Sequence, residues 1–289
     1  MSNTALLFAG QGAQALGMGK DLAEKYPAAR ALFDRANAAV GYDLAGICFH
    51  GSEPELTKTE NAQPGIYLVS WVAFQLLKEL VGDLKFEATA GLSLGETTAL
   101  AAANALSFEE GLKLVRQRGR FMHEACEATR GAMAAIIGLD EATTREICAE
   151  AGVELAKTKG AKKAVPLPVA GAYHSRLMAG AQPRLRASLA SVRLQSPTVT
   201  VVSNVTARPH SSVAEIQSLL VDQLTAPVRW EESMRFLLAQ RFTRFIELGP
   251  GKALSGFMKR IDKNAGTFNV ADAPSLEATV KALGVKRET

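Results

Sequence analysis

The chain has 289 residues, of which 47% are hydrophobic and 21% charged, and a formal net charge of +4. This composition allows a large buried core and excludes a disordered protein. No apolar stretch is long enough to cross a membrane, and the N-terminus lacks the basic lead and cleavage site of a signal peptide. Three cysteines without motif spacing favour a reducing compartment, so we expect a soluble cytoplasmic protein with no membrane partner.

Short apolar runs alternate along the chain with segments of helical periodicity. Strands are expected at residues 4–9, 131–138, 163–169, 199–205 and 242–248, with a further strand leading into residue 91. Helices are expected at residues 18–26, 28–40, 66–80, 97–106, 107–128, 140–151, 175–189, 213–224 and 252–262. Pro64 is taken as part of a helix start, and Ser107 with Glu110 as a capping box. The alternation indicates an α/β fold with a mainly parallel sheet.

Basic residues gather in three clusters, within residues 116–120, 157–163 and 252–263. They fit solvated helix faces, and they equally fit an acidic or phosphate-bearing partner. Nucleic acid is not expected as a partner, because no aromatic residues are interleaved with the charges and no binding module is recognisable.

The sequence Gly91-Leu92-Ser93-Leu94-Gly95 has the G-x-S-x-G pattern of a nucleophile elbow. In such an elbow a tight turn between strand and helix presents the serine at the tip of the sheet. Glycines two residues to either side leave room for backbone and substrate. The backbone N–H of Leu94, beside the first helical turn, is placed to face a developing oxyanion. The bare pattern also arises by chance in a glycine-rich chain, so it needs support from elsewhere.

A serine hydroxyl becomes a good nucleophile only when a base removes its proton. The four histidines of the chain are His50, His123, His174 and His210. His174 lies between a predicted strand and a predicted helix, where a site at the sheet tip would collect it. His50 and His210 lie in polar loops and are expected to face solvent, while His123 is on a helix face. Position alone favours His174 without excluding the others.

The loop Gly10-Gln11-Gly12-Ala13-Gln14-Ala15 follows a predicted strand and fits the dinucleotide pattern G-x-G-x-x-G/A. That fingerprint also needs a second strand ending in an acid about twenty residues on, whereas residues 28–40 look helical. Two other interpretations are open. The loop could offer the backbone N–H of Gln11 to an oxyanion beside Ser93, or it could be a structural turn.

Five separated motifs occur in order along the chain. They are Phe8-Ala9-Gly10-Gln11-Gly12-Ala13-Gln14, Gly91-Leu92-Ser93-Leu94-Gly95-Glu96, Arg116-Gln117-Arg118-Gly119, Gly171-Ala172-Tyr173-His174-Ser175 and Glu247-Leu248-Gly249-Pro250-Gly251-Lys252. Together they resemble the malonyl-CoA:acyl carrier protein transacylase family of fatty-acid and polyketide synthesis, from residue 4 to about 262. The resemblance implies a large α/β-hydrolase-like subdomain, residues 1–128 and 171–289, with a truncated ferredoxin-like subdomain, residues 129–170, inserted into it.

The resemblance also implies a role for particular residues. Ser93 matches the nucleophile, His174 its general base, and Arg118 the arginine that pairs with the free malonyl carboxylate. A guanidinium suits this task because it stays charged and grips a carboxylate through two parallel hydrogen bonds. The remaining matches are the backbone carbonyl of Gln223, which orients the base, Gln11 and Leu94 as oxyanion donors, Gln63 as a pocket residue, and Tyr173 as the aromatic residue that accompanies malonyl rather than methylmalonyl.

The reaction that the resemblance implies is a ping-pong transfer. The serine would take the malonyl group from malonyl-CoA as an ester and pass it to the phosphopantetheine thiol of an acyl carrier protein. No metal and no bound cofactor are required. Acyl carrier proteins are acidic, which would match the basic clusters of this chain.

Two alternatives use the same motifs. A serine hydrolase or thioesterase would have the same elbow and base with water as acceptor, but it has no use for a carboxylate clamp such as Arg118. A catalytically impaired homologue could still bind a carrier protein, although the retention of Ser93, His174 and Arg118 together argues against it.

The chain departs from the family pattern in two places. Leu92 stands where the family usually has a histidine before the nucleophile. After the helix ending near residue 151, roughly two dozen expected residues are absent, as judged by the spacing of the elements. The absent segment lines the acyl and thiol entrance in the family, and a two-stranded remnant is marginal by itself. We therefore expect altered substrate affinity or carrier docking with the nucleophile site retained.

Overall fold

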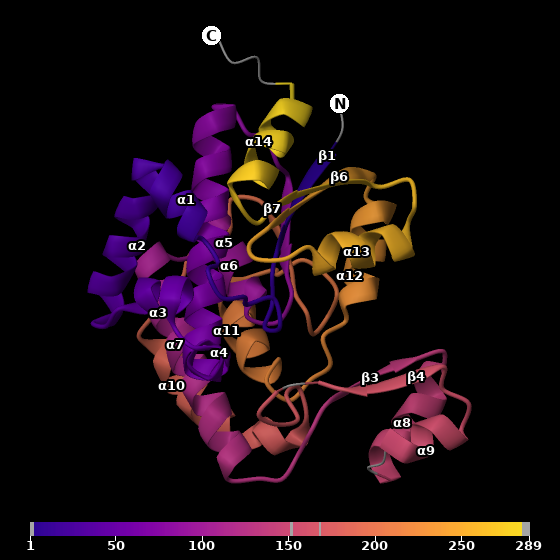
Figure 1. Cartoon of the computed structure of the whole chain (residues 1–289). Helices are drawn as coiled ribbons and strands as arrows, with labels where there is room; N and C mark the ends of the chain where they lie inside the picture. Colours follow the sequence, from indigo (N-terminus) through magenta and orange to yellow (C-terminus); the bar gives the residue numbers. More distant parts are fainter. Residues whose placement is uncertain (1–2, 151–152, 168, 285–289) are drawn as a thin grey trace.

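The computed structural model describes residues 3–150, 153–167 and 169–284. Five parallel strands form the central sheet in the order β5-β2-β1-β6-β7 (Figure 1). Their bounds are Asn3–Phe8 for β1, Ala88–Gly91 for β2, Thr200–Val202 for β5, Phe242–Leu248 for β6 and Gly266–Val270 for β7. The mainly parallel α/β sheet expected from the sequence is therefore confirmed.

Helices cover both faces of this sheet (Figure 1). The bounds of those before the second sheet are Lys20–Lys25 for α1, Pro27–Val40 for α2, Leu44–His50 for α3, Glu53–Thr57 for α4, Thr59–Val81 for α5, Gly95–Ala102 for α6 and Phe108–Glu127 for α7. Those after it are Gln182–Ala190 for α10, Val213–Asp222 for α11, Trp230–Ala239 for α12, Ala253–Ile261 for α13 and Ala273–Ala282 for α14, with a 3₁₀ helix, η1, at Arg176–Ala181. None of the described helices is both long and apolar enough to form a membrane span.

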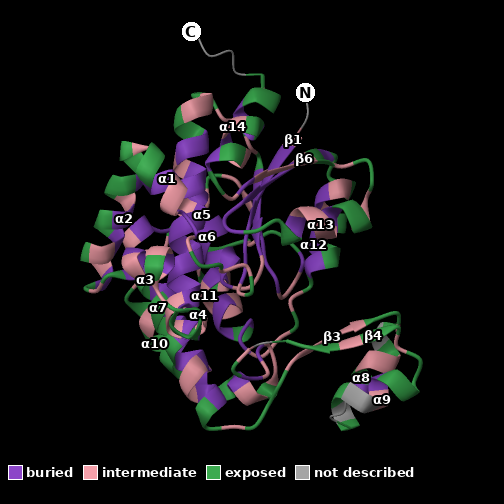
Figure 2. Cartoon of the chain, viewed as in Figure 1, coloured by how far each residue is buried: buried purple, intermediate pink, exposed green. Residues whose placement is uncertain are grey.

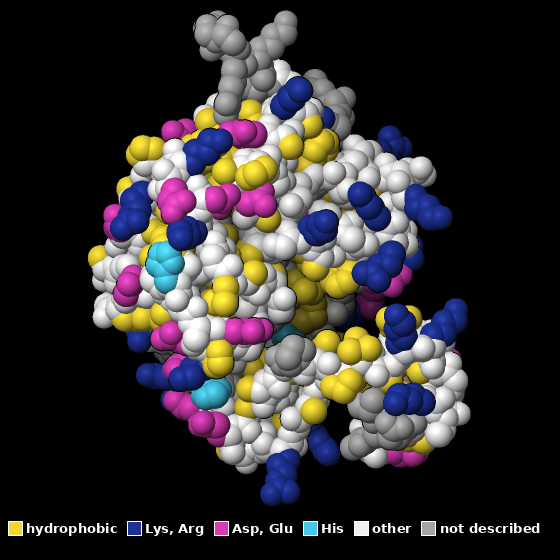
Figure 3. Space-filling model, viewed as in Figure 1, with side chains coloured by type: hydrophobic (Ala, Val, Ile, Leu, Met, Phe, Trp, Pro, Cys, Tyr) yellow, Lys and Arg dark blue, Asp and Glu magenta, His cyan; other side chains and the backbone are white. Residues whose placement is uncertain are grey.

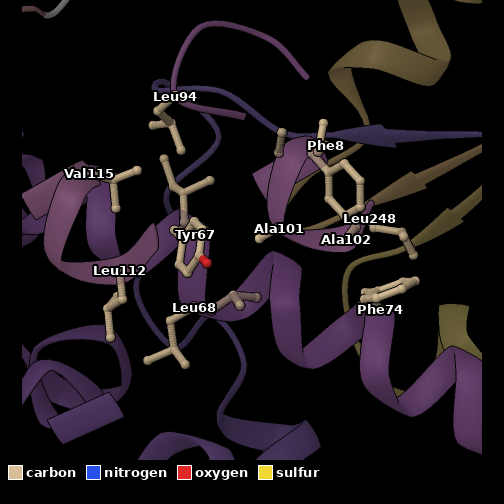
Figure 4. Packing of buried hydrophobic residues seen from close by; sticks show 14 of the residues in the cluster. Phe8, Tyr67, Leu68, Phe74, Leu94, Ala101, Ala102, Leu112, Val115 and Leu248 are labelled. Atoms are coloured by element: carbon tan, nitrogen blue, oxygen red, sulfur yellow. The ribbon is translucent and has the colours of Figure 1, made fainter. Parts of the chain in front are cut away.

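Strand β1 is apolar on both sides because it is buried on both sides. Leu6 and Phe8 belong to the large core cluster. Ala5 and Leu7 point the other way, into a smaller cluster formed with α12 and α13. Figure 2 shows β1 buried between the helices of the main body. Figure 4 shows Phe8 near Phe74 of α5, in an edge-to-face contact with ring centroids 6.2 Å apart.

The two longest helices, α5 and α7, pack closely against each other. A Cβ at Gly119 of α7 would lie 2.5 Å from the Thr59 carbonyl oxygen at the start of α5. The capping box of Ser107 and Glu110 opens α7 as expected. The expected start of α5 is wrong, because the helix begins at Thr59 and includes Pro64. Packing of the buried first turn outweighs the hydrogen bond that the proline cannot donate.

A second, two-stranded sheet stands apart from the main body, at the lower right of Figure 1. Its antiparallel strands are β3 (Ala134–Ile137) and β4 (Lys163–Pro166), joined through α8 (Glu141–Glu150) and α9 (Val153–Thr158). Ile147 and Ala156 are its buried apolar side chains among the described residues. The short helix α9 was not expected from the sequence. The unit lies within residues 129–170, the range expected for the small subdomain, whose boundaries stay a prediction.

The sequence-based expectations missed several other elements. The helices α3, α4 and α12 and the C-terminal pair β7 and α14 were not foreseen. Strand β7 lies at a sheet edge and is mostly half-buried, so its apolar pattern is weak. The single helix expected at residues 175–189 is divided into η1 and α10. Strand β6, in the middle of the sheet, has the expected bounds.

Close backbone contacts shape the turn between β2 and α6. A Cβ at Gly95 would lie 2.4 Å from the carbonyl oxygen of Phe8, at the end of β1. A Cβ at Gly91 would lie 1.9 Å from the carbonyl carbon of Gly95. Real Cβ atoms do not approach backbone this closely, so both positions require glycine. The serine between them is therefore held by the packing of α6 directly onto β1.

This packing predicts that Gly95→Ala destabilises the protein. The added methyl group must push α6 away from β1, and we expect a loss of about 2–3 kcal/mol in the free energy of unfolding in urea. Gly256→Ala is the matched control, since nothing lies within 4 Å of its added Cβ in the middle of α13. It should stabilise by roughly 0.5–1 kcal/mol. Equal effects of the two substitutions would contradict the packing argument.

Candidate active site

Ser93 lies at the carboxyl edge of the central sheet, between β2 and α6. Its φ of 54° is in the left-handed region, where a non-glycine residue is strained. Hydrogen bonds to residues outside the elbow help to hold the turn. The Ser93 N–H donates to Asn204 Oδ1 at 2.7 Å, and the Leu92 N–H donates to the Phe8 carbonyl at 3.0 Å. The side chain of Leu92 packs, partly buried, against the cluster of α12 and α13.

His174 is the histidine that reaches Ser93. Its Nε2 lies 2.8 Å from Ser93 Oγ, and its Nδ1 lies 2.8 Å from the main-chain oxygen of Gln223. A carbonyl oxygen can only accept, so Nδ1 carries the hydrogen when the ring is neutral and Nε2 is left to accept from the serine. His50 is exposed on α3, and His123 lies on α7 beside Glu127. The structure thus places His174, the histidine favoured by position, in contact with Ser93, while its role as the base stays a prediction.

Arg118 brings a buried positive charge to the same point. Its side chain comes from α7, and the residue is 3% exposed. Nη1 donates to Gln63 Oε1 at 2.8 Å, and Nη2 donates to Gln223 Oε1 at 2.8 Å and to Ser93 Oγ at 3.0 Å. These acceptors are all uncharged, and no ion pair joins Arg118 to a carboxylate in the described parts of the chain. A buried guanidinium without a carboxylate partner is costly unless a ligand supplies the negative charge.

Burial shifts the pKa of both His174 and Arg118. Burial and the positive charge of Arg118 lower the pKa of His174 to about 4. Burial lowers the pKa of Arg118 to about 10, against the opposing effect of the Glu96 charge. Near neutral pH the imidazole is therefore free to accept a proton, while the guanidinium keeps its charge.

A second set of side chains closes the site on the side of the glycine-rich loop. Gln63 Nε2 donates to Gln11 Oε1 at 3.2 Å. The phenol of Tyr173 lies 2.6 Å from Thr59 Oγ1 and 3.5 Å from Gln11 Nε2. Gln11, Gln63 and Tyr173, all expected site residues, thus form one network that reaches Arg118 through Gln63. Thr59, its fourth member, was not expected because its place at the start of α5 was missed.

Two backbone N–H groups remain available beside the serine. Those of Gln11 and Leu94 have no acceptor among the described residues. The two turns that carry them follow neighbouring strands, and a Cβ at Gly10 would lie 2.5 Å from the Leu92 carbonyl oxygen. Unpaired N–H groups on adjoining turns can together bind an oxygen that becomes negative. The structure thus brings together every residue that the sequence nominated for the site.

Sequence reasoning missed three polar residues behind the serine and was wrong about one of them. Glu96, Asn204 and His210 form a hydrogen-bonded group under the turn. His210 was expected to face solvent, but its side chain is 0% exposed and its Nε2 lies 2.8 Å from Glu96 Oε1. The loop before it folds back, with Pro209 bridging to Val202, and this tertiary contact has no local signal. Glu96 did have a local signal in the sequence, because it is the single charged residue at the start of an apolar helix.

Known proteins resemble this chain over nearly its whole length. Residues 5–165 match the acyl transferase domain family. The malonyl CoA-acyl carrier protein transacylase of Bacillus subtilis (strain 168) is 40% identical over 98% of both chains. That of Escherichia coli (strain K12) is 38% identical over 98% of this chain and 100% of its own length. This chain belongs to the malonyl CoA-acyl carrier protein transacylase family.

Solved structures of this transacylase family have the same fold. The malonyl CoA-acyl carrier protein transacylase of Coxiella burnetii superimposes with a TM-score of 0.93 at 34% identity, covering 98% of both chains. A malonyl-transacylase in complex with its type II polyketide synthase acyl-carrier protein gives a TM-score of 0.91 at 33% identity, covering 97% of this chain and all of that one. The expected two-subdomain α/β fold is confirmed.

The alignment shows how many residues of one relative have no counterpart in this chain, while their place in the small subdomain stays a prediction. It spans 312 positions with the Bacillus subtilis transacylase, against the 289 residues of this chain. That relative therefore has at least about two dozen residues without a counterpart here, which agrees with the number expected from element spacing. Figure 3 shows a hollow between the main body and the unit of β3, β4, α8 and α9.

The lowered pKa of His174 predicts a pH-dependent stability. Between its ordinary value of 6.5 and about 4, the unfolded chain binds a proton at this ring and the folded chain does not. Stability that is present above pH 6.5 should therefore be lost as the pH falls, by at most about 3–4 kcal/mol. Urea unfolding at several pH values should show a shallower loss for His174→Gln than for wild type. Parallel curves for the two proteins would contradict the burial of a neutral ring.

Proposed function

We propose that this chain transfers a malonyl group from malonyl-CoA to the phosphopantetheine thiol of an acyl carrier protein, through an ester on Ser93. The observation that carries the proposal is the buried guanidinium of Arg118, 3.0 Å from Ser93 Oγ and without a carboxylate partner among the described residues. A malonyl ester on Oγ has its free carboxylate only one methylene beyond the ester carbonyl. A short dicarboxylic acyl group therefore fits a positive charge this close to the nucleophile.

In the first half-reaction, His174 Nε2 accepts the proton of the Ser93 hydroxyl as Oγ attacks the thioester carbonyl. The N–H groups of Gln11 and Leu94 donate to the oxygen that becomes negative. The carbon–sulfur bond then breaks, and His174 returns the proton to the sulfur of the departing CoA. The Gln223 carbonyl keeps the ring in the required tautomer throughout.

In the second half-reaction, the carrier thiol gives its proton to His174 and its sulfur attacks the ester carbonyl. The bond to Ser93 Oγ breaks, and Oγ recovers the proton from Nε2. The scheme uses neither a metal nor a bound cofactor.

The choice of acyl group and of carrier involves other residues. Tyr173, held by Thr59, would crowd an α-methyl branch and so favour malonyl over methylmalonyl. The lysines exposed within residues 157–163 offer a positive surface to an acidic carrier protein.

The test is to incubate the protein with malonyl-CoA and a phosphopantetheinylated acyl carrier protein and to weigh the products by mass spectrometry. Malonylated carrier supports transfer. Free malonate would instead indicate a hydrolase, and unchanged reactants a binding homologue. Neither alternative is favoured by the relatives, whose names are those of transacylases. Ser93→Ala should abolish the reaction.

A cytoplasmic location of the protein stays a prediction from the cysteine content.

The carboxylate clamp predicts a change of acyl selectivity. Arg118→Ala should lower kcat/KM for malonyl-CoA at least about a hundredfold, because a buried charge-assisted contact is lost, and should affect acetyl-CoA much less. Arg116→Ala is the control on the same helix, since its guanidinium instead donates to the Val40 carbonyl and lies over the Tyr42 ring. Initial rates with both substrates measure the ratio. Equal losses for malonyl and acetyl transfer would refute the clamp.

The shortened small subdomain predicts weaker binding rather than weaker chemistry. We expect a higher KM for malonyl-CoA or carrier protein than in the Bacillus subtilis relative, because part of the expected wall of the entrance is absent. Stopped-flow labelling of Ser93 at saturating malonyl-CoA should remain comparable in the two enzymes. Matching KM values for both substrates would mean that the absent segment is dispensable.

A further inference from the structure

A buried carboxylate lies directly behind the nucleophile. Glu96 is the second residue of α6 and is 0% exposed, so it has no access to a substrate. Its Oε2 accepts from the Asn204 N–H at 2.9 Å and from Gln223 Nε2 at 2.7 Å. Its Oε1 lies 2.8 Å from His210 Nε2. All three groups are hydrogen-bond donors to the carboxylate, which is therefore satisfied without water.

Each of two partners of Glu96 also contacts a reacting group. Asn204 Oδ1 accepts from the N–H of Ser93, and Asn204 Nδ2 donates to the Gly91 carbonyl at 2.8 Å. The main-chain oxygen of Gln223 accepts from His174 Nδ1. Asn204 thus links Glu96 to the strained turn at Ser93, and Gln223 links it to His174.

The Gln223 side chain extends this network to Arg118. Its Nε2 donates to Glu96, while its Oε1 accepts from Arg118 Nη2 at 2.8 Å. An amide turned the other way would place its N–H groups against the guanidinium, where neither group could accept. The carboxylate of Glu96 therefore dictates which end of the amide faces Arg118.

The charge of Glu96 acts in the same direction. Arg118 has no carboxylate in contact among the described residues, and Glu96, on the far side of the Gln223 amide, favours the charged guanidinium. Its negative charge offsets part of the cost of the buried cation and still leaves the substrate side of Arg118 open. A carboxylate in direct contact would instead compete with the substrate.

We propose that Glu96 is a positioning residue for the acyl transfer, and that His210 holds Glu96 in place. Through Asn204 and Gln223, Glu96 sets the Ser93 turn, His174 and the guanidinium of Arg118. This inference rests on the proposed function. A buried Glu–His pair could instead serve the fold alone. If Glu96 positions catalytic groups, removing its carboxylate should lower the rate per folded molecule. If Glu96 supports only the fold, the rate per folded molecule should stay the same.

The test compares Glu96→Met, which keeps the length of the side chain but removes both acceptors, with Glu96→Gln, which keeps one. Per folded molecule, Glu96→Met should lower kcat at least about thirtyfold, because Ser93 and His174 lose part of their support, and should raise KM for malonyl-CoA more than KM for acetyl-CoA, because Arg118 is held less well. The ratio of malonyl to acetyl transfer should also fall. Glu96→Gln should recover most of kcat, since its oxygen can still accept from Gln223 and Asn204.

Glu247→Met is the matched control. Glu247 is 1% exposed at the end of β6 and accepts from the N–H groups of Leu254 and Ser255 at 3.0 and 2.7 Å, so it is a buried carboxylate of the fold. Its loss should reduce stability but leave kcat per folded molecule unchanged. If Glu96→Met does not fold, His210→Leu should lower kcat in the same direction by about three- to tenfold.

Wild-type kcat and selectivity in Glu96→Met, or in His210→Leu if only that variant folds, would overturn the inference. Failure of the proposed function is distinct, because then the wild type itself forms no malonylated carrier. In that case the rate at which a fluorophosphonate labels Ser93 still tests the inference, since it needs no acyl substrate. Slower labelling in Glu96→Met than in Glu247→Met would support positioning, and equal rates would refute it.

Discussion

The site depends on one steric constraint, the direct contact of α6 with the end of β1. Gly95 lies so close to the Phe8 carbonyl that no side chain fits between them. This contact forces the chain to turn within three residues after Gly91 and leaves Ser93 with a positive φ. Neighbouring parallel strands then bring the glycine-rich loop and the serine turn to the same edge. The position of Ser93 and of the neighbouring Gln11 and Leu94 N–H groups follows from this packing.

A second constraint is the balance of buried charge around the turn. Arg118 is surrounded by uncharged acceptors, while the nearby carboxylate, Glu96, is separated from it by the Gln223 amide. The amide therefore connects the two charges without joining them in an ion pair. His174 stays neutral partly because the guanidinium is close. The same positive charge would thus favour both an unprotonated base and an acidic acyl group.

The unit of β3 and β4 contrasts with this dense site. Ile137 and Val165 are 48% and 47% exposed, and strand pairing places them on the same face of the two-stranded sheet. A pair of helices can cover only one face of a two-stranded sheet, so the other face of the sheet remains exposed to solvent. The main sheet has no such exposed face, because α12 and α13 cover the side that the large core cluster does not. The unit of β3, β4, α8 and α9 thus leaves apolar side chains exposed on one face of its sheet, whereas both faces of the main sheet are covered.

The sequence by itself determined the elements with strong local signals and the residues within motifs. The central strands, the capping box of Ser107 and the elbow at Ser93 could be predicted because periodicity, caps and glycines act over a few residues. The roles assigned to Arg118 and Gln223 needed the family resemblance, because nothing local distinguishes them from surface residues. Only the tertiary structure decided that His210 is buried on Glu96, since that contact joins residues more than a hundred positions apart. Long-range packing creates such polar networks, and no local pattern records them.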